Sequence, residues 1–158
     1  MGCIHKDLKL ANIMMKKNVV KIGDFGLSDF IKGDVQHTRK LKGTKVYLAP
    51  ECFQGEYSPK TDCYVLGLLF LEIWMGQFYY EQDYFKGNSA NEVVELMKAG
   101  RRPKFVGPNN PPKPIQKFMT ACWSQESSDR PKAVECWRKL SSIQKVLNTD
   151  KRNAGVEK

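Results

Sequence analysis

The amino-terminal part of the chain carries the side chains best suited to chemistry. Asp7, Lys9 and Asn12 lie within one short segment, and Asp24 follows twelve residues after Asn12. Carboxylate and carboxamide oxygens suit Mg²⁺, and a lysine ammonium is a point charge that can bind a phosphate. Two loop aspartates are also common as turn and helix-capping residues, so the residue types alone leave both interpretations open.

Three short motifs favour the chemical interpretation because of their order along the chain. HKDLKLAN begins at His5, DFG begins at Asp24 and APE begins at Ala49. Together they resemble the motifs of the eukaryotic protein kinase family, and the resemblance extends from Ile4 to about Leu147. It implies the C-terminal (large) lobe of the kinase fold, which is mainly α-helical with a small β-hairpin.

The resemblance implies a role for each polar residue in transferring the γ-phosphate of ATP to a protein hydroxyl. Asp7 would accept a hydrogen bond from the hydroxyl and take its proton. Asn12 and Asp24 would hold Mg²⁺, and Lys9 would contact a phosphate. Thr44 resembles the residue that contacts Asp7 and Lys9. ATP and Mg²⁺ are therefore the implied cofactors, and a protein substrate is the implied partner.

Further positions indicate the type of kinase. Lys9 in the catalytic loop and Thr44 after a glycine are typical of the serine/threonine kinases of the family. The CW pair at Cys122 and the DRP triplet at Asp129 resemble the tyrosine-kinase-like group, in particular receptor-interacting and mixed-lineage kinases. The resemblance therefore favours a serine/threonine protein kinase.

Other matching positions have structural roles in the family. Phe25 and Gly26 complete the DFG motif. Glu51 and Arg130 match an ion pair that fastens the activation segment to the helical lobe. Asp62 resembles the residue that holds the backbone of the catalytic loop. These five residues are expected to support the site without taking part in the chemistry.

Lys6 departs from the commoner family pattern, which has arginine at this position. That arginine clamps a phosphate on the activation segment bidentately, which lysine cannot do, so control by phosphorylation is expected to be weaker. Ser28, Thr38 and Thr44 are candidate phosphorylation sites. A phosphate on Thr38 would lie beside two basic residues and could order the loop. An unmodified, flexible loop is the alternative.

The front of the chain also departs from the pattern. No Gly-rich loop and no phosphate-pairing lysine of the N-terminal lobe precede Met1. We therefore expect a fragment that lacks the ATP-covering lobe and transfers no phosphate by itself. A non-catalytic, kinase-like signalling module that acts by binding other proteins is the alternative function. Residues 61–75 are apolar all round, so one side of the predicted helix would lack a partner and favour association.

Composition limits the remaining possibilities. The 158 residues are 41% hydrophobic and 27% charged, which is typical of one globular domain or a piece of one. The net charge is +9, but basic residues are spread along the chain without a recognition motif, so nucleic acid is not an expected partner. The apolar run at residues 63–71 is too short to span a membrane. Five irregularly spaced cysteines indicate reduced thiols and a cytoplasmic location.

Local patterns predict the elements that position these residues. Residues 1–147 are expected to form the kinase lobe, and residues 148–158 a disordered tail. Ser89 and Glu92 form a predicted capping box, and Gly100 is expected to end that helix. The predicted elements are a hairpin of residues 13–15 and 19–22, a long loop at 23–43, a buried helix at 61–75, helices at 89–98, 115–123 and 132–147, and an irregular connector at 107–114.

Overall fold

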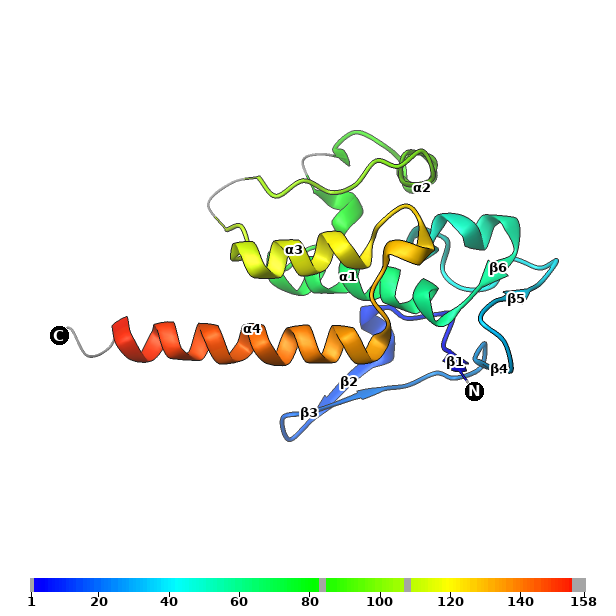
Figure 1. The fold of residues 1–158 in the computed structure, drawn as a ribbon. Helices are drawn as coiled ribbons and strands as arrows, with labels where there is room; N and C mark the ends of the chain where they lie inside the picture. Colours follow the sequence, from blue (N-terminus) through cyan, green and yellow to red (C-terminus); the bar gives the residue numbers. More distant parts are fainter. Residues whose placement is uncertain (1, 83–84, 107–108, 155–158) are drawn as a thin grey trace.

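Helix α1 lies at the centre of the structure, a computed structural model that describes residues 2–82, 85–106 and 109–154 (Figure 1). It spans Pro59–Met75. The hydroxyl of Ser58 caps its first turn by accepting from the Lys60 amide, and Gly76 ends it in a left-handed conformation with φ 69°. Nine of its 17 residues are buried, which confirms the buried helix predicted over residues 61–75, although Ile73 and Trp74 near its end are exposed.

Two further helices pack against α1. Helix α3 spans Lys113–Cys122 and helix α4 spans Ala133–Ala154. A Cβ atom on Gly67 of α1 would lie 2.8 Å from the Cβ of Cys122, so glycine permits the close approach of α1 and α3. Helix α3 begins two residues before its predicted start because Pro114 lies in its first turn, where proline is tolerated.

Helix α4 is longer than the sequence pattern predicted. It continues past residue 147 to Ala154. The sequence pattern predicted that the helix ends at residue 147 and that a disordered tail begins at residue 148. Residues 148–154 contain no proline or glycine, so nothing in this segment stops a helix that α1 and α3 already support. The remainder of that predicted tail, residues 155–158, lies outside the described residues.

Helix α2 confirms the predicted capping box. It spans Ala90–Lys98, and the Ser89 hydroxyl and the Glu92 carboxylate cap each other's backbone amides. At the other end Gly100 has φ +88°, its amide donates to the Met97 carbonyl, and the next amide reaches back to the carbonyl of Leu96. This pair of bonds is a Schellman motif, which satisfies the last carbonyls of the helix.

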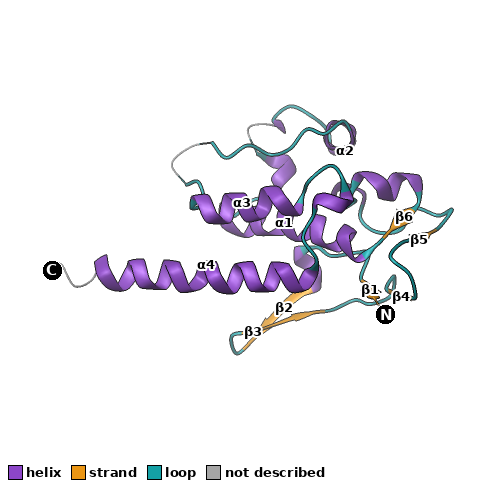
Figure 2. Cartoon of the chain, viewed as in Figure 1, coloured by secondary structure: helices purple, strands orange, loops and turns teal. Residues whose placement is uncertain are grey.

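The predicted hairpin is confirmed by strands β2, Ile13–Lys16, and β3, Val19–Ile22. They pair antiparallel, and Ile13 lies opposite Ile22. The two residues between the strands, Lys17 and Asn18, both have positive φ, as a tight hairpin turn that matches the twist of the strands requires. In Figure 2 the hairpin extends away from the helices as a separate arm.

The segment predicted as a loop at residues 23–43 contains two short strands, so the hairpin is not the only β-structure. Strand β4, Asp29–Ile31, pairs with β1, Gly2–Ile4, and strand β5, Gln36–His37, pairs with β6, Glu56–Tyr57. All four strands have only two or three residues, and each partner is distant in the sequence. No local alternation of apolar residues could therefore have revealed them.

The core lies around α1 and is rich in aromatic residues. Tyr64, Tyr79 and Phe85 are essentially inaccessible, and the Trp123 ring stacks on that of Phe105 with centroids 5.8 Å apart. Among the described residues, no helix is long and apolar enough to cross a membrane. Ile4, at the beginning of the segment that contains the motifs, is fully buried in this core.

Candidate active site

The carboxylate of Asp7 is the centre of a dense hydrogen-bond network. Its Oδ1 accepts from the Thr44 hydroxyl at 2.7 Å and from the Thr44 backbone amide at 2.9 Å. Its Oδ2 lies 2.7 Å from the ammonium of Lys9. Lys9 also donates to the Thr44 hydroxyl at 3.2 Å, so the three side chains form a closed triangle.

This environment keeps Asp7 ionised. Burial on its own raises the pKa of the carboxyl, but hydrogen bonds from Lys9 and Thr44 and the charge of Lys9 outweigh it and hold the pKa below its usual value. Asp7 is therefore a hydrogen-bond acceptor at neutral pH. Its orientation is fixed by the contacts on both oxygens.

Gly43 allows Thr44 to reach Asp7. It adopts a left-handed backbone with φ +99°, and a Cβ atom there would lie 2.2 Å from the carbonyl oxygen of Lys6. A side chain at this position would push the segment away from the loop that carries Asp7. The glycine before Thr44 is therefore required by the close contact between two backbone segments.

The amide group of Asn12 is oriented by the same loop. It lies at the end of a short 3₁₀ turn, Leu10–Asn12, and its Nδ2 donates to the backbone carbonyl of Asp7 at 2.8 Å. This bond directs the carboxamide oxygen away from that carbonyl. The same nitrogen lies 3.4 Å from Asp7 Oδ2, so the nitrogen faces Asp7 and the carboxamide oxygen is the group that can act as a neutral hard donor.

Asp24 lies next to this group through its backbone. The amide of Gly23 donates to the Asn12 carbonyl at 2.8 Å, and the Gly23 carbonyl lies 2.9 Å from Nε2 of His5. Asp24 itself has φ 60° and an exposed carboxylate, whose Oδ1 is 3.4 Å from the Gly26 amide. The structure thus joins Asp24 to the loop that carries Asp7 through its neighbour Gly23.

These oxygen donors fit Mg²⁺. Asn12 and Asp24 supply one carboxamide and one carboxylate oxygen, the ligand types that this hard cation prefers. No larger group of three His, Cys, Asp or Glu side chains suited to a metal occurs among the described residues. Mg²⁺ commonly takes only one or two protein ligands and completes its shell with water and substrate phosphates, so two donors are compatible with it.

The other residues of the DFG motif lie at the surface. The Phe25 ring is 58% exposed and lies against the His5 ring, with centroids 5.0 Å apart. Gly26 is also exposed. His5 therefore contacts Phe25 of the motif through its ring and Gly23, the residue before the motif, through its Nε2 atom.

Asp62 holds the backbone of the loop that carries Asp7. Its Oδ2 accepts from the His5 amide at 2.7 Å and its Oδ1 accepts from the Lys6 amide at 3.1 Å. Burial raises the pKa of Asp62, although both amide bonds oppose that rise. Because Asp62 belongs to the first turn of α1, it attaches the loop directly to the central helix.

Glu51 and Arg130 form a bidentate ion pair, with N–O distances of 2.6 and 2.9 Å. The remaining guanidinium N–H groups donate to the carbonyls of Ser124, Gln125 and Lys60. All five donors of the buried Arg130 are thereby used. The pair connects the APE motif to the turn that precedes α4.

Sequence reasoning missed the partners of Lys6. Its buried ammonium forms an ion pair with Asp29 and a hydrogen bond with Gln36. Both partners lie in segment 23–43, where the sequence pattern indicated only a loop. The sequence shows only a lysine directly before Asp7, and the burial that makes this lysine require a nearby anion is seen only in the structure.

The candidate phosphorylation sites have partners of their own. The hydroxyl of Ser28 donates to the His5 carbonyl at 3.3 Å. The Thr38 hydroxyl exchanges hydrogen bonds with the backbone of Lys40, at 3.3 and 3.4 Å. Thr44 is engaged with Asp7, as described above. Ser28 and Thr38, the two loop candidates outside the Asp7 network, are both partly buried.

Comparison with known proteins identifies the family of the chain. A family model described as the protein kinase domain matches residues 1–140. The chain is 37% identical to the probable serine/threonine-protein kinase roco7 of Dictyostelium discoideum over 94% of its own length and 6% of that protein. It is 32% identical to a dual serine/threonine and tyrosine protein kinase of Xenopus tropicalis, over 82% of the chain and 14% of that protein.

A third relative is the ankyrin repeat-containing protein kinase A of Dictyostelium discoideum, which is 33% identical over 94% of the chain and 11% of that protein. The chain thus spans only a small part of the length of these relatives. Its Asp7, Asn12 and Asp24 lie inside the matched range. The chain therefore belongs to the protein kinase family.

Proposed function

We propose that this chain provides the catalytic loop and activation segment of a serine/threonine protein kinase, which transfers the γ-phosphate of ATP to a hydroxyl of a protein. The observation that carries the proposal is the fixed, ionised carboxylate of Asp7, held by Thr44 and Lys9. Phosphoryl transfer needs little covalent help from the protein and depends on positioning and on charge neutralisation. The Asp7 network supplies positioning.

Asp7 orients the substrate hydroxyl by accepting its hydrogen bond. Because its pKa lies below the usual value, the carboxylate is a weak base at neutral pH. It therefore takes the proton when the attacking oxygen has begun to bond to phosphorus and has become acidic. Lys9 lies 2.7 Å from Asp7 and can contact the same transferring phosphate as a point charge.

Asn12 and Asp24 are the residues that would hold Mg²⁺. When bound with ATP, this ion neutralises the charge of the phosphate oxygens. The bond from Asn12 Nδ2 to the Asp7 carbonyl keeps the carboxamide oxygen in place before the ion arrives. The bond from the Gly23 amide to the Asn12 carbonyl, which holds the residue before Asp24 beside Asn12, supports this pairing.

Serine and threonine are the proposed acceptors because Lys9 and Thr44, which border the Asp7 carboxylate, resemble residues typical of the serine/threonine kinases of the family. The name of one relative, a dual serine/threonine and tyrosine kinase, adds tyrosine as a second class to test. A non-catalytic module that only binds partners is the competing proposal. Retention of Asp7, Asn12 and Asp24 favours catalysis.

The test is transfer of labelled phosphate from Mg²⁺-ATP to a mixed protein substrate, with protein produced from the complete reading frame. Asp7→Asn is expected to lower the rate by at least about 100-fold, because an amide accepts no proton. Asp34→Asn removes the same charge from an exposed position and serves as the control. Equal transfer by the wild-type and Asp7→Asn proteins would refute the role of Asp7, and phosphotyrosine in the product would correct the acceptor class.

A further inference from the structure

The ammonium of Lys6 is a charge that the fold must neutralise. Its side chain has no accessible surface, and it immediately precedes Asp7. Its own backbone is left-handed with φ 69°, and its amide is held by Asp62. A buried ammonium without a partner is strongly unfavourable, so the groups around it contribute directly to the conformation of the catalytic loop.

The two side chains that accept hydrogen bonds from Lys6 come from one later segment of the chain. Asp29 Oδ2 forms an ion pair with Lys6, and Gln36 Oε1 accepts a hydrogen bond from it. Gln36 in turn donates to Asp29 at 3.2 Å, which closes a triangle of three side chains. The face of the Tyr57 ring lies 5.5 Å from the ammonium, and Lys42 lies 3.6 Å from Asp29.

The strand pairing puts this triangle where two short sheets meet the loop. Asp29 belongs to β4 and lies opposite Ile4 of β1, two residues before Lys6. Gln36 belongs to β5 and lies opposite Tyr57 of β6. The side-chain network therefore ties both halves of residues 29–37 to the loop that carries Asp7. All members of this network are unmodified side chains of the polypeptide.

We propose that the network of Lys6, Asp29 and Gln36 holds residues 29–37 against the catalytic loop without any phosphate on that segment. This inference rests on the proposed kinase function. Asp29 and Gln36 are then positioning residues that act on Asp7 through Lys6. Thr38 and Ser28 form their hydrogen bonds with Lys40 and His5 and take no part in the network.

Hydrogen exchange tests the network independently of enzymatic activity. In protein from the complete reading frame, Asp29→Asn is expected to raise exchange of the amides in β4 and β5 by at least about tenfold, since the pairing to β1 and β6 opens more often. Asp34→Asn, an exposed aspartate of the same segment, is the charge-matched control and is expected to leave exchange unchanged. Equal exchange in the two variants would overturn the proposal.

Kinetics then test the positioning role. Asp29→Asn is expected to lower kcat at least about tenfold while KM for ATP stays within about twofold, because Asp7 is displaced and the nucleotide contacts are not. Asp29→Glu, which keeps the carboxylate, is expected to restore most of kcat. If Asp29→Asn does not fold, Gln36→Leu removes one acceptor and is expected to show a smaller loss of the same kind. A rise in KM alone would contradict the assignment.

Phosphatase treatment decides whether a phosphate is needed. Wild-type protein whose residues 24–43 are shown by mass spectrometry to carry no phosphate is expected to keep its kcat within about twofold. A loss that rephosphorylation reverses would overturn the proposal. If the wild-type protein transfers no phosphate at all, the proposed kinase function fails, and the exchange experiment still decides whether the network holds the segment.

Discussion

At the scale of single residues, the site depends on close contacts that tolerate no added atoms. The Asp7 carboxylate receives hydrogen bonds on both oxygens, and the segment that brings Thr44 to it passes against the Lys6 carbonyl. Gly43 is the residue that makes this passage possible. Glycine is required at position 43 for a steric reason, so this requirement can be tested apart from the chemistry of the carboxylate.

Gly43→Ala is therefore expected to separate Thr44 from Asp7. The new Cβ would lie 2.2 Å from the Lys6 carbonyl oxygen, and the left-handed backbone adds a further cost of about 1–2 kcal/mol for a residue with a side chain. We expect kcat to fall by about 100-fold, measured as phosphate transfer by the protein from the complete reading frame.

The matched control is Gly33→Ala. A Cβ atom at Gly33 would meet nothing within 4 Å, so the change is expected to alter stability by less than about 0.5 kcal/mol and to leave kcat unchanged. If the two alanine variants behave alike, the contact between Gly43 and Lys6 does not limit the position of Thr44.

At the scale of elements, structures with a local sequence signal could be predicted, and strands formed by long-range pairing could not. The hairpin of β2 and β3, the capping box of α2 and the buried helix α1 could be predicted because each has its signal within a few consecutive residues. Strands β1, β4, β5 and β6 could not, because each is too short to show a pattern and pairs with a distant segment.

The same distinction applies to the candidate site. Asp7, Asn12 and Asp24 belong to recognisable motifs, so the sequence indicated them as a group. Asp29 belongs to no motif, and its importance comes from its contact with Lys6, which is 23 positions away in sequence. Contacts between segments depend on tertiary packing, which periodicity within one segment does not encode.

Arg130 is the residue that joins elements to one another, and Arg130→Lys is expected to destabilise the fold. Lysine supplies three donors from one point and cannot form the two parallel bonds to Glu51 or reach the three carbonyls around it. Because the group is buried, we expect a loss of about 3 kcal/mol in the free energy of unfolding, measured by urea denaturation.

Arg138→Lys provides the comparison for this experiment. Arg138 lies on α4 and is exposed, so the same chemical change there is expected to alter the free energy of unfolding by less than about 0.5 kcal/mol. Equal effects at the two positions would mean that the bidentate bond between Arg130 and Glu51 contributes little to the fold.

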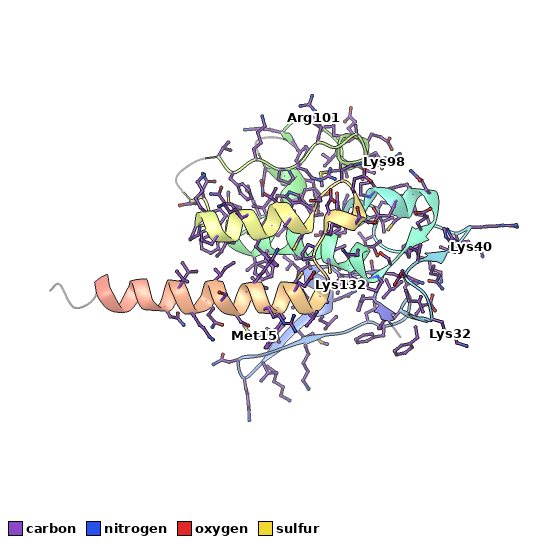
Figure 3. All side chains as sticks on the ribbon, viewed as in Figure 1. Met15, Lys32, Lys40, Lys98, Arg101 and Lys132 are labelled. Atoms are coloured by element: carbon purple, nitrogen blue, oxygen red, sulfur yellow. The ribbon has the colours of Figure 1, made fainter. Side chains whose placement is uncertain are left out.

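At the scale of the whole molecule, charge and apolar surface are distributed differently. Figure 3 shows labelled basic side chains on separate parts of the molecule, from Lys98 and Arg101 near α2 to Lys32 and Lys40 near the short sheets. The hairpin carries a group of exposed apolar side chains, and single ones lie elsewhere, as at Phe30, Ile73 and Trp137. On the hairpin, those exposed by about half or more are Met14, Met15, Val19, Val20 and Ile22.

This apolar arm is expected to make the 158-residue chain self-associate. Met15 and Val20 lie opposite each other across the strands and are 74% and 62% exposed. Replacing both by lysine is expected to shift the elution of the chain on gel filtration toward that of an 18.1 kDa monomer.

Val35→Lys with Leu41→Lys is the control, because these apolar residues are also exposed but lie away from the hairpin. The control pair is expected to leave the elution volume unchanged. Unaltered association in the hairpin variant, or an equal shift in both, would show that another surface drives the contact.

Under the proposed function, the ion pair between Lys6 and Asp29 has a consequence for how the kinase activity is regulated. A carboxylate that belongs to the polypeptide cannot be added or hydrolysed by another enzyme, whereas a phosphate can. A segment that is ordered by such a carboxylate reaches its ordered conformation as soon as the protein has folded. The activity of the protein would then be set by its rate of synthesis, its rate of degradation and the proteins that bind it in the cell.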